Sequence, residues 1–184
     1  FNPRGAGIYY WDESAGTAFR AVNISTLGTA SDTPAAALQV MVSDIDRHVI
    51  AFACSPLGGT AIDPLLIRWS DQEDAGNWTP TATNSSGGQV ISVGTLIIGA
   101  YKTRREILVF TDVGIPSMRF SGAPFIYSFS TIAENVSLMS PKSAKVAGDA
   151  VYFMDREGFY VYRGSVERLQ CSVYNYVFDN LNIE

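Results

Sequence analysis

Histidine and cysteine are nearly absent from this 184-residue sequence, which contains one histidine and two cysteines. Cys54 and Cys171 belong to no CxxC pair, and together with His48 they do not match the spacing of a zinc site. The favoured interpretation is two buried free thiols. A disulfide between them stays open, because sequence does not show whether the two side chains are neighbours. We therefore expect no metal and no cofactor.

Catalytic motifs are missing as well. The sequence has no Walker loop, no GxSxG and no HExxH. A Ser-His-Asp triad would depend on His48 alone, which follows Arg47 at the start of an expected strand and is interpreted as a surface or cap residue. Acidic pairs such as Asp44 with Asp46 fall in turns, where aspartate is common. We expect that the chain is not an enzyme.

Charged residues are also few, at 17% of the chain, and 18 acids against 13 bases give a net charge of −5. This balance argues against a broad surface that grips nucleic-acid phosphates. The local basic stretch from Lys102 to Arg105 is interpreted as a solvated hairpin tip, with a nucleic-acid contact as the alternative. No apolar run approaches the roughly 18 residues that span a membrane. The first residues show no secretory leader, and a start at Phe1 is expected of a processed chain or of part of a longer one.

The sequence does contain a repeated strand–turn–strand pattern. Hydrophobic residues make up 47% of the chain, as in a globular protein. The pattern occurs at Ile8–Val22, Val49–Asp71, Ile107–Phe120 and Val151–Arg163. Units of roughly 40 to 50 residues with several strands each are typical of propeller blades.

We therefore predict an all-β fold of antiparallel, β-propeller-like repeats. About four blade-like units are expected in a single domain, near residues 1–37, 38–92, 93–140 and 141–184; an incomplete propeller or a fragment of one is also open. The predicted core consists of strand residues packed between blades, namely Ile107, Val109, Val151, Phe153 and Tyr160. Apolar residues at helical spacing near positions 173–177 predict a short helix, with the entry to a missing blade as the alternative.

The segment from Ser70 to Trp78 resembles an Asp-box, a turn found in some propeller hairpins. We interpret Asp71, Asp74 and Gly76 as turn residues and Trp78 as a packing residue. The alternative function for such a turn is a sugar or calcium site.

Three polar segments are long for hairpin connections and are rich in glycine, serine and threonine. They are 23–37, 55–62 and the loop formed by Asn84, Ser85, Ser86, Gly87, Gly88 and Gln89. We expect them to be mobile in the isolated chain and to make assembly contacts with neighbouring chains.

A set of phrases in fixed order carries a resemblance to a known family. IRWSDQEDAGNWTPT, TRREILVFTD, GAPF, NVSLMSP and YFMDREGFYVYRG occur in this order between Asp63 and about Cys171. As an ordered set they are similar to the propeller-bearing hub or nozzle (tail tubular) proteins of short-tailed bacteriophages. Members of that family are usually far longer than this chain.

The resemblance implies a structural virion protein of a phage tail, made in the cytoplasm of the bacterial host, with no catalytic residues. Its expected partners are further copies in a ring, six-fold by family resemblance, and other tail proteins such as an adaptor or a tail fibre. Viral DNA would pass through the ring, and a mildly acidic lumen would not retain it. No membrane span is expected. The alternative function is a carbohydrate-binding or sialidase-like propeller module, supported only by the Asp-box-like turn.

Overall fold

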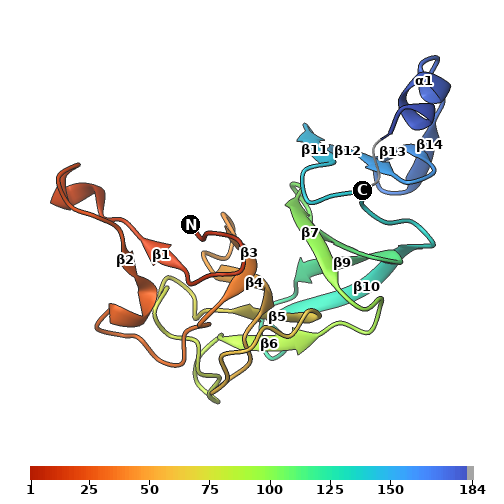
Figure 1. Ribbon diagram of the computed structural model, residues 1–184. Coiled ribbons are helices and arrows are strands. Elements are labelled where there is room, and N and C mark those ends of the chain that lie inside the picture. Colours follow the sequence, from red (N-terminus) through yellow and green to blue (C-terminus); the bar gives the residue numbers. More distant parts are fainter. Residues whose placement is uncertain (182–184) are drawn as a thin grey trace. The chain divides into compact units, whose positions relative to one another are not determined.

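The computed structural model describes residues 1–181 and is mostly β, with three four-stranded antiparallel sheets and one two-stranded sheet (Figure 1). Within the described residues the sheets form no closed propeller. The chain divides into two compact units, each described by itself below. Unit 1 comprises residues 1–92 and 120–127, and unit 2 comprises residues 93–119 and the chain from Ser128 onward.

Unit 1 contains the two-stranded sheet and one four-stranded sheet. The two-stranded sheet pairs β1 (Tyr9–Tyr10) with β2 (Val22–Asn23). Two 3-10 turns, η1 (Glu13–Ala15) and η2 (Ile24–Thr26), accompany it. The four-stranded sheet runs in the order β3 (Ala37–Val42), β4 (Val49–Cys54), β5 (Leu66–Trp69) and β6 (Gly87–Val90).

Unit 2 contains the other two sheets and the only α-helix of the described residues. One sheet consists of β7 (Ile97–Lys102), β8 (Ile107–Thr111), β9 (Gly114–Phe120) and β10 (Tyr127–Glu134). The last residue of β9, Phe120, and the first residue of β10, Tyr127, are assigned to unit 1. The other consists of β11 (Ala144–Ala147), β12 (Ala150–Asp155), β13 (Gly158–Tyr162) and β14 (Val166–Leu169). Helix α1 (Tyr174–Asp179) follows.

Each four-stranded sheet is a meander, in which every strand pairs with its neighbour in sequence. This is the strand arrangement of a propeller blade. The first predicted repeat differs, because its only strand pairs are Tyr9 with Asn23 and Tyr10 with Val22. The three other predicted hairpins are confirmed as β4–β5, β8–β9 and β12–β13. The predicted helix is α1, whereas β14 was not predicted.

Each unit has its own apolar core. In unit 1, Ile8, Ile24, Ala51 and Trp78 are buried together. In unit 2, Leu108, Phe110, Ile115, Val151 and Phe153 are buried together. Strand β12 illustrates how a strand contributes to this core. Val151 and Phe153 are buried while the intervening Tyr152 is exposed, which is the alternation expected of a half-buried strand.

Burial confirms four of the five predicted core residues. Ile107, Val109, Val151 and Phe153 are buried. Tyr160 is only half-buried, and its ring stacks on Phe153 with centroids 5.5 Å apart.

Candidate functional site

The Asp-box-like turn is held entirely by its own chain. Oδ1 of Asp71 accepts hydrogen bonds from the backbone N–H groups of Gln72 and Ser85, at 2.9 and 2.8 Å, and from the Ser85 hydroxyl at 2.6 Å. Burial raises the pKa of Asp71, but these hydrogen bonds outweigh it and hold the pKa below its usual value. The carboxylate therefore serves as a fixed anchor for residue 85.

Asp74, Gly76 and Trp78 complete this turn. Oδ1 of Asp74 accepts from the Gly76 N–H at 2.9 Å and from the Thr29 hydroxyl at 2.6 Å. The indole of Trp78 is fully buried, and its N–H donates to the Ala75 carbonyl at 2.8 Å. Because this indole is buried, Trp78 offers no exposed aromatic face on which a sugar ring could stack.

The segment from Asn84 to Gln89 is not a free loop, contrary to the sequence-based expectation. Its last three residues, Gly87 to Gln89, are the first three of β6 and pair with β5. Asn84 donates to the Thr79 carbonyl at 2.8 Å, and Ser86 is buried. Gly-Gly predicts a loop because glycine is disfavoured in strands. Here a Cβ on Gly87 would lie 2.7 Å from the Trp69 ring, so the strand requires glycine at that position.

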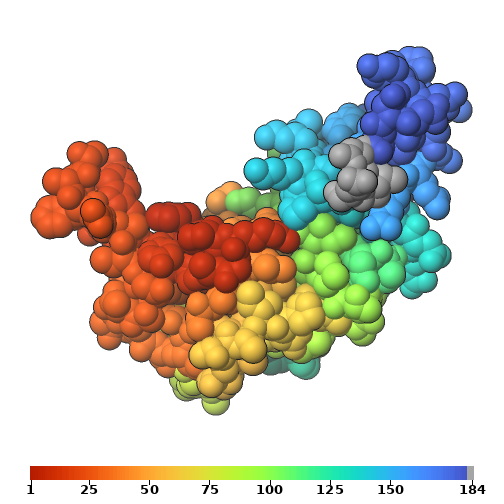
Figure 2. All heavy atoms as spheres, viewed as in Figure 1, coloured from red at the N-terminus to blue at the C-terminus, as the bar shows by residue number. Residues whose placement is uncertain are grey.

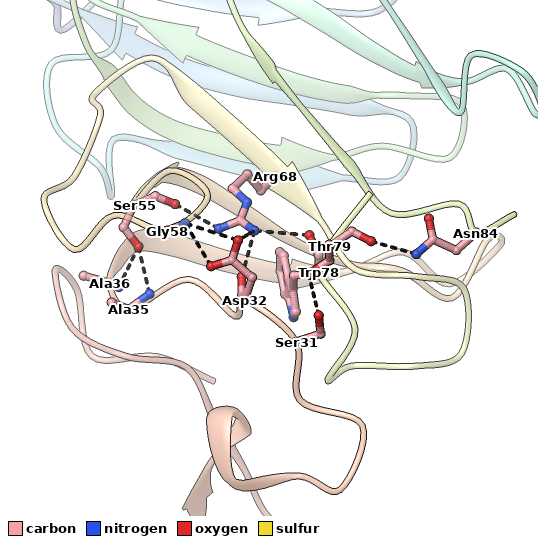
Figure 3. A network of polar contacts seen from close by, with 10 residues as sticks. All are labelled: Ser31, Asp32, Ala35, Ala36, Ser55, Gly58, Arg68, Trp78, Thr79 and Asn84. Atoms are coloured by element: carbon pink, nitrogen blue, oxygen red, sulfur yellow. Dashed lines mark hydrogen bonds and ion pairs between the residues drawn. The ribbon is translucent and has the colours of Figure 1, made fainter. Parts of the chain in front are cut away.

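The two other predicted assembly loops are fastened to each other by Arg68, which is 4% exposed (Figure 3). Its guanidinium donates to the carbonyls of Asp32 at 2.7 Å and Ser55 at 3.2 Å. The Asp32 carboxylate in turn accepts from the Gly58 N–H at 2.9 Å, and the Ser55 hydroxyl accepts from the Ala35 N–H at 2.8 Å. A buried arginine of the same chain therefore ties segment 23–37 to segment 55–62, at Asp32 and Ser55.

The same arginine reaches the Asp-box-like turn, since it also donates to the Trp78 carbonyl at 3.2 Å. Sequence analysis missed Arg68 because an arginine inside an apolar strand, IRW, carries no signal for what its side chain meets. Burial lowers the pKa of Arg68, although Cys54 and Asp32 act in the opposite direction. Three carbonyls and one carboxylate compensate for the buried charge, as such a charge requires.

His48 is 1% exposed, so its interpretation as a surface or cap residue is wrong. Its Nδ1 lies 2.9 Å from the Tyr127 hydroxyl, and its Nε2 lies 3.0 Å from the Ser85 hydroxyl. Tyr127 donates to the Asp46 carboxylate at 2.9 Å. A tyrosine therefore stands between the histidine and the carboxylate, and the Ser85 oxygen is occupied by the N–H of Gln72 at 2.9 Å. These contacts tie the β3–β4 turn to residues 85 and 127.

Unit 2 has a pocket of about 910 Å³ at the β7–β8 turn, and its lining includes Arg104, Glu106 and Arg119. Arg104 in that turn pairs with Asp149 at 3.2 Å, and its side chain is 78% exposed. The buried Glu106 beneath it accepts from the hydroxyls of Ser117 and Tyr162 and from the Arg119 Nε at 2.9 Å. The exposure of Arg104 fits a solvated hairpin tip.

Unit 1 exposes several apolar side chains on the loop joined by β1 and β2, which we name the aromatic arm (residues 10–22). The exposed fractions are 42% for Trp11 and 66% for Phe19. Figure 1 shows the arm reaching away from the β3–β6 sheet of unit 1, and Figure 2 shows its tip as a separate lobe. The sequence predicted a hairpin here. The pattern of apolar residues does not show that the rest of the chain leaves both faces of this hairpin exposed to solvent.

Both cysteines are free thiols in the described structure, with Cys54 buried and Cys171 half-buried. Burial raises the pKa of Cys54 to about 12, so its thiol stays protonated at neutral pH. No group of three or more His, Cys, Asp or Glu side chains that could hold a metal ion occurs among residues 1–181. In the same residues, no helix is long and apolar enough to cross a membrane.

Comparison with known proteins adds no assignment. No protein-family model matches the chain, and no curated protein matches it at a significant level of similarity.

Proposed function

We propose that this chain is a structural subunit of a bacteriophage tail, in a hub or nozzle ring around the DNA conduit, and that it acts through contacts between subunits rather than through catalysis. One observation carries the proposal: the aromatic arm exposes Tyr10, Trp11, Phe19 and Val22 on a ribbon of only two residue pairs. An isolated two-stranded ribbon is marginally stable in water. Such a ribbon with uncovered aromatic side chains is typical of a segment that is stabilised by a partner.

Two further features support the proposal. The three four-stranded meanders have the form of blades, which agrees with the propeller-bearing family that the ordered phrases resemble. The polar residues that could suggest a site, Asp71, Asp74 and His48, hold segments of unit 1 together. The carbohydrate-binding alternative loses the support of the Asp-box-like turn, because Trp78 is buried.

The test is to locate the chain in particles. Phage purified from a host lysate should contain peptides of this chain in a constant ratio to the major tail proteins, and gold-labelled antibodies should mark the tail. Purified particles that lack the chain, with the chain remaining in the soluble lysate, would refute the proposal.

A further inference from the structure

The aromatic arm combines apolar surface with an acidic tip. All its residues except Gly16 and Ala21 are exposed. Asp12 and Glu13 stand at the tip, where Asp12 caps η1 by accepting from the N–H and hydroxyl of Ser14 at 2.8 and 2.7 Å. This hydrogen-bonded turn directly follows Trp11 in the chain, so the two carboxylates are its neighbours.

A concave apolar surface with lysines beside it lies on the last sheet of unit 2, and we name it the β11–β14 groove. It has a volume of about 600 Å³ and is lined mainly by apolar atoms. Its apolar lining includes Ala144, Tyr152, Met154, Phe159, Tyr160 and Leu169. A concave, largely apolar surface of this size is large enough to accept an aromatic side chain.

Two lysines beside the groove are opposite in charge to the two carboxylates of the arm, which also carries Arg20. The chain has three lysines, and two of them, Lys142 and Lys145, line the groove. Both are exposed, and neither forms an ion pair with another residue of the part that the structure describes. Two lysines with no ion-pair partner among residues 1–181, beside an apolar groove, favour a ligand with aromatic groups next to carboxylates. The arm has Trp11 next to Asp12 and Glu13.

We infer that the aromatic arm of one copy docks in the β11–β14 groove of a second copy of the same chain. Trp11 and Phe19 enter the apolar groove, and Asp12 and Glu13 face Lys142 and Lys145. The contact joins two different surfaces, so it is heterologous and generates a ring if the rotation between copies closes. The inference rests on the proposed self-assembly and names the surfaces that perform it.

A zero-length cross-linker tests the pairing directly, because it joins a carboxylate to an amine only where the two touch. Full-length chain labelled with ¹⁵N is mixed with unlabelled chain, allowed to exchange and then treated with a carbodiimide. We expect mixed-isotope peptides that link Asp12 or Glu13 to Lys142 or Lys145. Links found only within chains of one label would show that the arm docks in its own chain, which would overturn the inference.

Charge reversal tests the same contact by affinity. Glu13→Lys, or Lys142→Glu with Lys145→Glu, should each weaken self-association of the full chain by at least about tenfold, and combining them should restore most of the loss. Phe19→Ala should weaken it similarly. The matched controls are Glu134→Lys and Phe125→Ala, which change an exposed charge and an exposed aromatic outside both surfaces.

The outcomes separate this inference from the proposed function. If the wild-type chain associates and the arm and groove variants associate equally well, the docking surfaces are wrong while self-assembly stands. A second outcome is that the arm variant and the groove variant each weaken association, with unchanged circular dichroism, but their combination does not restore it. In that case the direct pairing of these charges is wrong. If the wild-type chain does not associate at all, the proposed function fails with it.

Discussion

The hydroxyl of Tyr127 lies 2.9 Å from Nδ1 of His48, across 79 residues of sequence. The same hydroxyl donates to the Asp46 carboxylate at 2.9 Å, so Tyr127 links the histidine ring to Asp46. The edge of the Tyr127 ring also contacts Trp69, with centroids 5.0 Å apart. The only histidine of the chain therefore holds one part of unit 1 to another.

This position gives His48 a defined effect on stability. Burial lowers its pKa, although Asp46 and Asp71 oppose this. Above about pH 6.5 the ring is neutral in the folded and unfolded states, so the free energy of unfolding should be constant. As the pH falls from there toward the lower pKa of the folded state, the unfolded chain gains a proton before the folded chain does, so stability should decrease. Urea unfolding between pH 7.5 and 5.5 measures this slope, and His48→Gln should remove most of it.

Glu106 should stabilise unit 2 through the charged form of its side chain, whereas His48 stabilises unit 1 in its neutral form. Burial raises its pKa, but hydrogen bonds from Ser117, Tyr162 and Arg119 outweigh this and lower it. The contribution of Glu106 to the free energy of unfolding is therefore fully present above about pH 4.5. It is lost as the pH falls through the lower pKa of the folded state. Glu106→Gln should cost roughly 2 kcal/mol at pH 7, measured by urea unfolding. The exposed control Glu134→Gln should cost almost nothing; equal effects of the two substitutions would contradict this account.

Strand β6 depends on Gly87. An added Cβ would meet the Trp69 ring at 2.7 Å, and that ring is fixed because its N–H donates to the Ser85 carbonyl at 2.9 Å. Gly87→Ala should therefore destabilise unit 1 by about 1 to 3 kcal/mol. Gly28→Ala is the control, since no atom lies within 4 Å of its added Cβ and its backbone conformation suits any residue. If thermal unfolding does not distinguish the two variants, the tight packing over Gly87 is absent in solution.

Phe153 tests the core of unit 2. It is 3% exposed and its ring meets Phe110 with centroids 5.0 Å apart. Phe153→Ala should reduce the free energy of unfolding by about 3 to 5 kcal/mol. Phe125→Ala, at a residue that is 77% exposed, should change it by less than about 0.5 kcal/mol. A loss below about 1 kcal/mol for Phe153→Ala would remove this residue from the core.

The sequence predicted the strands well where apolar alternation or an apolar run was strong, as in β8 and β12. It failed where a long-range partner decides the structure. Gly87 and Gly88 form a strand because Trp69 and Arg68 of β5 pair with them, and no local property of two glycines shows this. His48 is buried because Tyr127, far away in sequence, covers it.

The candidate surfaces show the same limit. The loop compositions pointed to 23–37, 55–62 and 84–89 as assembly segments, yet Arg68 and Asp71 fasten residues of all three within unit 1. Deleting 84–89 would therefore remove part of β6 and the Ser85 partner of Asp71, so the deletion would disturb the fold of unit 1 as well as any assembly contact. The aromatic arm was visible only as a hairpin, because exposure depends on what the rest of the chain leaves uncovered.

Analytical ultracentrifugation of the full-length chain over a wide concentration range tests the central claim most directly. We predict a monomer that gives way, as concentration rises, to one discrete ring-sized species without intermediate aggregates. A chain that sediments as a monomer at every concentration, with its β-rich circular dichroism spectrum intact, would contradict the proposal that it functions by assembling with copies of itself.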